Sequence, residues 1–353
     1  MTVYSVGIIG CGQIAGAHVD GFALTGRATV RAVYDIDAER ARGKSEQWCA
    51  QVAESAEALV GSVDIVVIAT PGFARLEYVK LAVDAGVHIL CEKPMALDLD
   101  DAHAIEAMVR ESRGVFMIAF NQRYEPAPAT LQEIAASGRL GGIVSAWIRW
   151  HAPAPSQRWR NIEASGRWRL SFDLSGGRIN EFSSHAVDWL LWVLREPESV
   201  YGRALHVTEG FALDDGHYAT FNCESGPGLL DVARNAAVKP ARSYGIVGHA
   251  GSVQLGDDGI WLTLIDAELI QVPVSAPPSK HDHLLDCIES GDRPKTRHPG
   301  RARHAASSSC VQPLGPQRRR RTHWLTSCHQ CIGSPAEFAQ HRRMLCHRCH
   351  DES

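Results

Sequence analysis

The chain has 353 residues, of which 45% are hydrophobic and 22% charged, and its net charge is −4. This composition is ordinary for a globular protein of about two domains, and it argues against a body that binds nucleic acid. We expect no membrane association, because no apolar run of about 18 residues occurs, and a cytoplasmic location, because the start "MTVYSVGIIGCG" lacks the pattern of a signal peptide.

The first half of the chain alternates short apolar runs with helix-like stretches. The expected strands cover 3–10, 29–35, 63–70, 87–92 and 115–120, and the expected helices 14–24, 38–50, 74–86 and 99–112. Strands and helices that alternate at this spacing indicate an α/β Rossmann domain, with a doubly wound parallel sheet and helices on both faces. We place this domain at residues 1–123.

A different pattern follows at residues 124–296. Strands are expected at 143–152, 200–208, 217–223, 228–236, 244–255, 259–265 and 268–274, with helices at 185–195 and 281–290. This predicts an α+β domain with an open, largely antiparallel or mixed sheet. An exposed sheet face of this apolar kind usually finds a partner, so we expect a homo-oligomer, a dimer or a tetramer.

A glycine-rich turn joins the first strand to the first helix. Gly10, Gly12 and Ala15 fit the pattern G-x-G-x-x-A, in which the backbone approaches a pyrophosphate at a helix N-terminus. The residues expected to bind the cofactor here are Gly10, Cys11, Gly12, Gln13 and Ile14. A purely structural turn is the alternative.

Two later features support a dinucleotide site. Asp35 ends the second strand, close to the ~20 positions expected between the glycines and a ribose-binding acid. Its carboxylate favours NAD, although Arg31 or Arg40 could offset it and permit NADP. The third strand ends in Thr70 and Pro71, at the sheet edge where a cofactor ribose would lie.

Several segments together resemble a known family. The segments "GIIGCGQIAGAH", "VDIVVIATP", "AGVHILCEKPMAL", "FNQRYEP" and "GGRINEFSSHAVDWLLWVL" occur in this order. They resemble the glucose–fructose oxidoreductase / inositol dehydrogenase / rhizopine-catabolism family (GFO/IDH/MocA) over residues 3–295. The resemblance implies hydride transfer between nicotinamide and a carbon of a sugar or cyclic polyol.

The resemblance also implies catalytic residues. Lys93 matches the catalytic lysine and His185 the catalytic histidine, while Glu181 occupies the place of a common aspartate. Arg75 stands where many relatives have histidine. On chemical grounds, an ammonium beside NAD⁺ is expected to have a lowered pKa, and a histidine, whose unperturbed pKa is near ~6.5, could relay its proton.

Other residues are expected around the reacting atoms. We expect Glu92 and Asn121 at the cofactor, and Arg123 at the substrate, with a structural cap at the domain junction as the alternative for Asn121 and Arg123. Trp159 and Arg160 suit sugar stacking and hydroxyl binding, although a surface loop is the alternative. Asp188 is expected to be a structural carboxylate on a buried helix.

The last segment, 297–353, is a basic tail rich in cysteine and histidine. It carries Cys328, Cys331, Cys346 and Cys349 as two C-x-x-C pairs. The spacing permits a zinc ribbon. The abrupt change of composition instead favours a disordered or out-of-frame tail without metal.

We therefore predict an NAD(P)-dependent dehydrogenase or reductase acting on a sugar or polyol. Two alternatives remain open at this point. One is a non-catalytic, NAD-binding sugar sensor, and the other is a glycosidase that uses NAD for transient oxidation.

Overall fold

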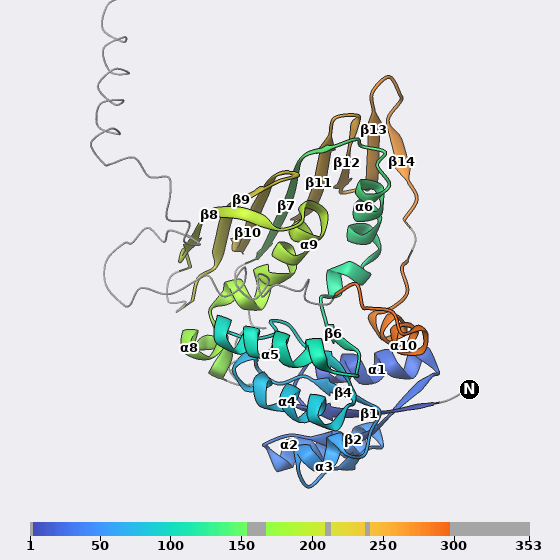
Figure 1. Ribbon diagram of the computed structural model, residues 1–353. Helices are drawn as coiled ribbons and strands as arrows, with labels where there is room; N and C mark the ends of the chain where they lie inside the picture. The colour runs from blue at the N-terminus through green and yellow to red at the C-terminus, as the bar shows by residue number, and fades with distance from the viewer. Residues whose placement is uncertain (1–2, 154–166, 209–212, 237–240, 275, 297–353) are drawn as a thin grey trace, which may run out of the picture.

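The computed structural model describes residues 3–153, 167–208, 213–236, 241–274 and 276–296 (Figure 1). Two sheets lie one above the other in this view, the N-terminal one below. Within the described ranges, no helix combines the length and apolar character needed to cross a bilayer.

Six parallel strands form the lower sheet, in the order β3-β2-β1-β4-β5-β6. Their bounds are β1 Tyr4–Ile9, β2 Ala28–Tyr34, β3 Gln51–Val52, β4 Ile65–Ile68, β5 His88–Cys91 and β6 Phe116–Ile118. The aliphatic residues of β1 and β4 are fully buried, as expected for parallel strands covered on both faces. The predicted doubly wound sheet is confirmed.

Helices cover both faces of this sheet. On one face, α3 (Ala56–Val60), α4 (Arg75–Ala85) and α5 (Leu99–Glu111) form a core with the strands. On the other, α1 (Ala15–Thr25) packs beside α10 (Lys280–Ser290), which contributes Leu284 and Leu285 to the core. α2 (Ala38–Trp48) follows β2. A helix from the far end of the described chain thus completes the first domain.

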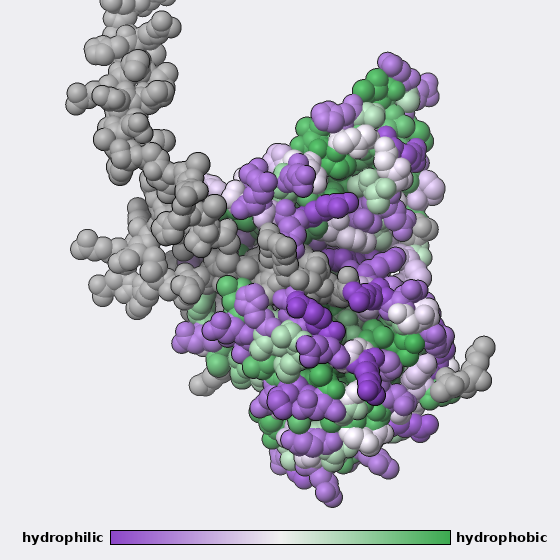
Figure 2. All heavy atoms as spheres, in the orientation of Figure 1, coloured by the Kyte–Doolittle hydropathy of each residue, from purple (hydrophilic) through white to green (hydrophobic). Residues whose placement is uncertain are grey.

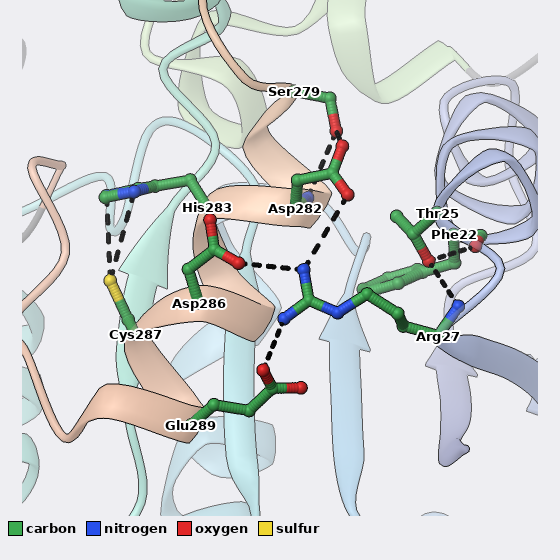
Figure 3. A network of polar contacts seen from close by, with 9 residues as sticks. All are labelled: Phe22, Thr25, Arg27, Ser279, Asp282, His283, Asp286, Cys287 and Glu289. Carbon is green, nitrogen blue, oxygen red and sulfur yellow. Dashed lines mark hydrogen bonds and ion pairs between the residues drawn. The ribbon is translucent and has the colours of Figure 1, made fainter. Parts of the chain in front are cut away.

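Polar contacts also hold α10 in place. Arg27, which follows α1, lies 2.8 Å from both Asp286 and Glu289, and 3.9 Å from Asp282 (Figure 3). These groups are partly exposed, so each ion pair contributes little to stability. His281 is buried against Gly21, where an added Cβ would lie 2.0 Å from His281 Cε1.

Eight strands form the upper sheet, in the order β14-β13-β12-β11-β7-β10-β9-β8. Their bounds are β7 Ile143–Pro153, β8 Pro197–Leu205, β9 Gly216–Cys223, β10 Gly226–Ala236, β11 Ala241–Gly248, β12 Gly251–Gly256, β13 Gly259–Leu264 and β14 Ile270–Val272. β7 and β10 are parallel and the other neighbours antiparallel, so the predicted mixed sheet is confirmed.

Two helices, α6 (Pro126–Ala136) and α9 (Ser184–Leu194), pack on one side of this sheet (Figure 1). Trp189 of α9 is fully buried against Tyr244 of β11, with ring centroids 4.8 Å apart. A short helix, α8 (Phe172–Ser175), precedes a π-helical turn at Ile179–Ser183 that leads into α9. The second core therefore fixes the start of α9 beside the first domain.

Some elements differ from the expectation. The run 244–255 forms a hairpin of β11 and β12, because Gly248 pairs with Gly251 across a two-residue loop. A Cβ at either glycine would lie 2.2–2.3 Å from a neighbouring carbonyl oxygen. The helix α6 has no counterpart among the elements expected from the sequence. Pro126 occupies its first turn, where a proline costs no hydrogen bond.

Candidate functional site

The glycine turn opens a cavity of about 850 Å³ at the carboxyl edge of the lower sheet. Gly10 has φ +96°, and a Cβ there would lie 2.9 Å from the carbonyl carbon of Ala69. At Gly12 a Cβ would meet nothing within 4 Å, so the backbone borders open space. Gln13 and Ile14 complete the turn and line the cavity. This arrangement leaves room for a pyrophosphate at the start of α1.

Asp35 lines the same cavity and also fixes the turn. Its Oδ2 accepts a hydrogen bond from Cys11 N at 2.8 Å, and its Oδ1 accepts one from Asp37 N at 2.9 Å. Arg40 Nη1 lies 3.1 and 3.2 Å from the two oxygens. Of the two arginines considered in the sequence, Arg40 is therefore beside the carboxylate, whereas Arg31 is exposed.

A second cavity of about 410 Å³ adjoins the first where β4 and β5 end. The residues that line both cavities are Gln13, Ile14, Ala69, Thr70, Trp168 and Arg169. The other residues that line the smaller cavity are Arg75, Glu92, Lys93, Asn121, Glu181 and His185. Pro71 lines the larger cavity. Predicted cofactor and catalytic residues from both domains thus border two cavities that share part of their walls.

Lys93 links the two domains at this cavity. It follows β5, is partly buried, and precedes Pro94 in a cis peptide bond. Its Nζ donates a hydrogen bond to the carbonyl oxygen of Glu181 at 2.8 Å. The ammonium therefore lies inside the cleft beside the π-helical turn.

Glu181 and His185 come from that turn and from the start of α9. Although burial opposes ionisation, the charges of Lys93 and Arg169 lower the pKa of Glu181, whose Oε2 accepts from Arg169 Nε at 3.1 Å. Burial, followed by the charge of Lys93, lowers the pKa of His185 to about 3. This pKa lies well below the unperturbed ~6.5 of histidine, because His185 is enclosed next to a cation.

The His185 ring is consequently neutral near pH 7. Its Nδ1 is buried and has no hydrogen-bond partner. Thr70 Oγ1, in the same cavity wall, also lacks one. Unpaired buried polar atoms are costly, so atoms of this kind mark places where a ligand can supply a partner.

Glu92 belongs to a buried network behind Lys93. Its Oε1 lies 3.1 Å from His18 Nε2, and its Oε2 accepts from Lys93 N at 3.2 Å. Burial opposes ionisation, but the hydrogen bond from His18 and neighbouring cations lower the pKa of Glu92 to about 2. His18 Nδ1 in turn lies 3.2 Å from His281 Nε2 on α10. Because ionised Glu92 can only accept, His18 donates through Nε2 and His281 through its own Nε2.

Asn121 is held by α10 as well. Lys280 Nζ donates to Asn121 Oδ1 at 2.7 Å, and burial lowers the pKa of Lys280. Since the amide oxygen is engaged, the amide N–H₂ of Asn121 is the group left for a ligand in the cavity.

Arg123 differs from its expected role as a substrate contact. Its Nε and Nη2 donate to the two carboxylate oxygens of Asp188 at 2.8 and 2.7 Å, and its Nη1 donates to Lys295 O at 2.6 Å. It is 9% exposed and lines neither cavity. Arg123 is a structural group, because all its nitrogens bind protein acceptors, and Asp188 has the structural role expected of it.

The sequence reasoning missed several residues at the site. Trp168 and Arg169 repeat the Trp-Arg pair of Trp159 and Arg160, and they line both cavities. Their position just before the segment "SFDLSGG", which leads to Glu181, was the available signal. Trp159, Arg160 and the tail cysteines Cys328, Cys331, Cys346 and Cys349 lie outside the described residues. Within the described part, no group of histidine, cysteine or carboxylate side chains could hold a metal ion.

Comparisons with known proteins agree with this architecture. The chain is 27% identical to inositol 2-dehydrogenase 3 of Saccharopolyspora erythraea over 73% of this chain and 74% of that protein. It is 26% identical to glucose-6-phosphate 3-dehydrogenase of Bacillus subtilis over 55% of each chain, so the match spans about half the length of that relative. UDP-N-acetylglucosamine 3-dehydrogenase of Acidithiobacillus ferrooxidans has a similar fold, with a TM-score of 0.74, 22% identity, and coverage of 88% of this chain and 97% of that one.

Family models match both halves of the molecule. Residues 4–120 match the oxidoreductase family with an NAD-binding Rossmann fold, and residues 129–254 match the GFO/IDH/MocA C-terminal domain. The chain therefore belongs to the GFO/IDH/MocA oxidoreductases and carries their NAD-binding domain.

Proposed function

We propose that this oxidoreductase transfers a hydride between NAD and a secondary alcohol or ketone carbon of a sugar, sugar derivative or inositol-like polyol. The observation that supports this most directly is the meeting of Lys93, His185 and the glycine turn around one cavity. Bound NAD would supply the hydride acceptor or donor. The relatives named above act, by their names, on inositol and on a sugar phosphate.

The residues of the chain fit such a cofactor. The turn from Gly10 to Ile14 would hold the pyrophosphate, and Asp35 the adenosine ribose. Thr70, Pro71, Glu92 and Asn121 would position the nicotinamide half. The carboxamide oxygen of the nicotinamide is a suitable acceptor for the free amide N–H₂ of Asn121.

We assign the proton transfer to Lys93 and His185. Oxidation of an alcohol needs a proton removed from oxygen while hydride leaves carbon. Lys93, held by the Glu181 carbonyl, would exchange this proton with the substrate oxygen. His185 is neutral, so its free Nδ1 would accept a hydrogen bond from the substrate hydroxyl or pass the proton on. Glu181 would balance the charge of Lys93.

A panel of sugars and polyols, incubated with NAD and followed by NADH absorbance, tests the function. Net NADH formation with at least one member supports it. Turnover without net NADH would favour the redox glycosidase, and sugar binding without turnover would favour the sensor. Running each reaction with NADP as well measures the cofactor preference.

A further inference from the structure

Arg75, the first residue of α4, is a buried cation in the wall of the smaller cavity. Its side chain is 4% exposed. Nε and Nη2 both donate to the carbonyl oxygen of Thr70, at 3.0 and 2.7 Å, whereas Nη1 has no hydrogen-bond partner. None of the carboxylates in the described ranges forms an ion pair with this guanidinium.

This arrangement leaves a positive charge poorly compensated. A buried ion is costly unless an opposite charge and hydrogen bonds replace the water it has lost. The Thr70 carbonyl offers only a partial negative charge. The N-terminus of α4 adds a further positive potential at the same place.

The two carboxylates of the cavity are committed to other donors. Glu181 accepts from Arg169 at 3.1 Å, and Glu92 from His18 and from Lys93 N. Lys93 Nζ itself donates to a carbonyl oxygen. The smaller cavity therefore presents two cations, Arg75 and Lys93, neither of which forms a direct ion pair with a carboxylate of the described residues, although the charges of both lower the pKa of Glu181.

We propose that the substrate carries an anionic group, a carboxylate or a phosphate, and that Arg75 binds this group in the smaller cavity. The proposal rests on the proposed hydride transfer and narrows its substrate class to acidic sugars or polyols. A neutral hydroxyl could satisfy the free N–H of Arg75 but would leave its charge uncompensated. An anionic group supplies both a hydrogen-bond acceptor and a compensating negative charge. A guanidinium forms strong charge-assisted hydrogen bonds to a carboxylate or to a phosphate.

Matched sugars that differ in the anionic group test the proposal. Initial rates with NAD are measured for D-glucose, D-glucuronate and D-glucose 6-phosphate, and for myo-inositol as a neutral polyol. We expect kcat/KM for at least one anionic sugar to exceed that for glucose by tenfold or more. Comparison of kcat/KM for D-glucuronate with that for D-glucose 6-phosphate shows whether the site prefers a carboxylate or a phosphate.

Variants identify the residue responsible. In Arg75→Met the ratio of kcat/KM between the preferred anionic sugar and glucose should fall at least tenfold, and Arg75→Lys should retain part of it. Arg139→Met, at an exposed arginine beyond α6, serves as the control and should keep the ratio. NADH affinity, measured by fluorescence, shows that each variant is folded.

The outcomes separate the two proposals. NADH formation from neutral sugars alone, or an equal loss with glucose and the anionic sugar in Arg75→Met, would overturn the anion site and leave hydride transfer standing. The second result would mean that Arg75 serves the cofactor or the fold. If no sugar is oxidised, glucuronate and glucose 6-phosphate are titrated into the enzyme–NADH complex. If either sugar binds saturably and Arg75→Met abolishes this binding, the result supports the anion site without the redox function. If neither sugar binds, the result overturns both the anion site and the proposed hydride transfer.

Discussion

At the scale of single residues, Lys93 has the position that a proton-transfer group needs. Its ammonium is inside the cleft, bound to the Glu181 carbonyl, and Gln13 and Ile14 of the cofactor turn line the same cavity. Replacing it with alanine removes the proton acceptor but leaves the glycine turn intact. We expect Lys93→Ala to lower kcat by about 10²–10⁴-fold, as measured by steady-state rates.

The same variant should bind the cofactor nearly normally. NADH affinity, followed by fluorescence titration, should change by less than about threefold, because this residue contacts neither Asp35 nor the glycine turn. Lys80→Ala, at an exposed lysine that pairs with Asp84 on α4, is the control for both measurements. A Lys93→Ala enzyme with full turnover would remove the basis of the proposed chemistry.

Arg40 is predicted to set the tolerance for NADP. Its guanidinium lies 3.1 Å from Asp35 and partly neutralises the carboxylate that would repel a 2′-phosphate. Arg40→Ala should therefore lower kcat/KM with NADP relative to NAD by about tenfold, the equivalent of about 1.4 kcal/mol. The measurement is the ratio of the two specificity constants. An unchanged ratio would show that the arginine serves only to anchor Asp35.

At the scale of elements, the docking of α10 depends on close packing more than on ion pairs. His281 occupies the space where Gly21 lacks a side chain, and an added Cβ would lie 2.0 Å from the imidazole. Gly21→Ala should therefore lower the free energy of unfolding by about 1–3 kcal/mol in urea titrations. His281→Ala should be less harmful in the Gly21→Ala background than alone, by about 1 kcal/mol or more.

A matched glycine provides the control for this experiment. Gly43 lies within α2, and a Cβ there would meet nothing within 4 Å. Gly43→Ala should stabilise the protein slightly, because alanine favours helix more than glycine does. Additive losses in the double variant of Gly21 and His281 would contradict the packing argument.

Two buried histidines, His18 of α1 and His281 of α10, predict that the free energy of unfolding falls in acid. Burial lowers the pKa of His18, and burial with the charge of Lys280 lowers that of His281 to about 2. Because both folded-state pKa values lie below the unperturbed ~6.5, the unfolded chain binds more protons than the folded one as pH falls below ~6.5. Stability is thus fully present above pH ~6.5 and is lost as pH falls below it, by about 2 kcal/mol at pH 5 for His281, and His18 contributes in the same direction.

This prediction is tested by urea unfolding at pH 7 and pH 5. His281→Leu removes one titrating group, so the loss of stability between the two pH values should be smaller than in the unchanged chain. His103→Gln is the control, since its imidazole is 61% exposed. An identical loss in His281→Leu would mean that His281 is protonated in the folded state.

At the scale of the whole molecule, the sequence revealed what depends on local order. The glycine turn, Asp35 and Lys93 each follow a strand, and parallel strands bring their carboxyl ends to one edge. Lys280 and His281 could not be predicted as site residues, because only the return of α10 to the first domain brings them near Asn121 and His18. The sequence left two roles open for Arg123 because its partner, Asp188, lies 65 positions away.

The second sheet carries the last prediction, which concerns assembly. Helices α6 and α9 cover one face, and the register places Tyr201, Leu229, Trp147 and Trp261 in one row across the other. Tyr201 is 65% and Leu229 47% exposed. Apolar residues also gather near the β13–β14 hairpin, where Ile265 and Leu269 are exposed (Figure 2). Large apolar patches of this kind mark interaction surfaces, and self-association is the commonest use of such a face.

We therefore expect a homodimer or a larger even-numbered assembly formed through this face. Leu229→Glu places a charge at the centre of the row and should reduce the mass measured by light scattering to that of a smaller species, with the NADH affinity retained. Leu24→Glu, on the 88% exposed Leu24 of α1, should leave the mass unchanged. A monomeric unchanged chain, or an assembly indifferent to Leu229→Glu, would show that the row does not form the contact. Because the cavities lie at the opposite side of the second core, loss of assembly should affect stability before it affects cofactor binding.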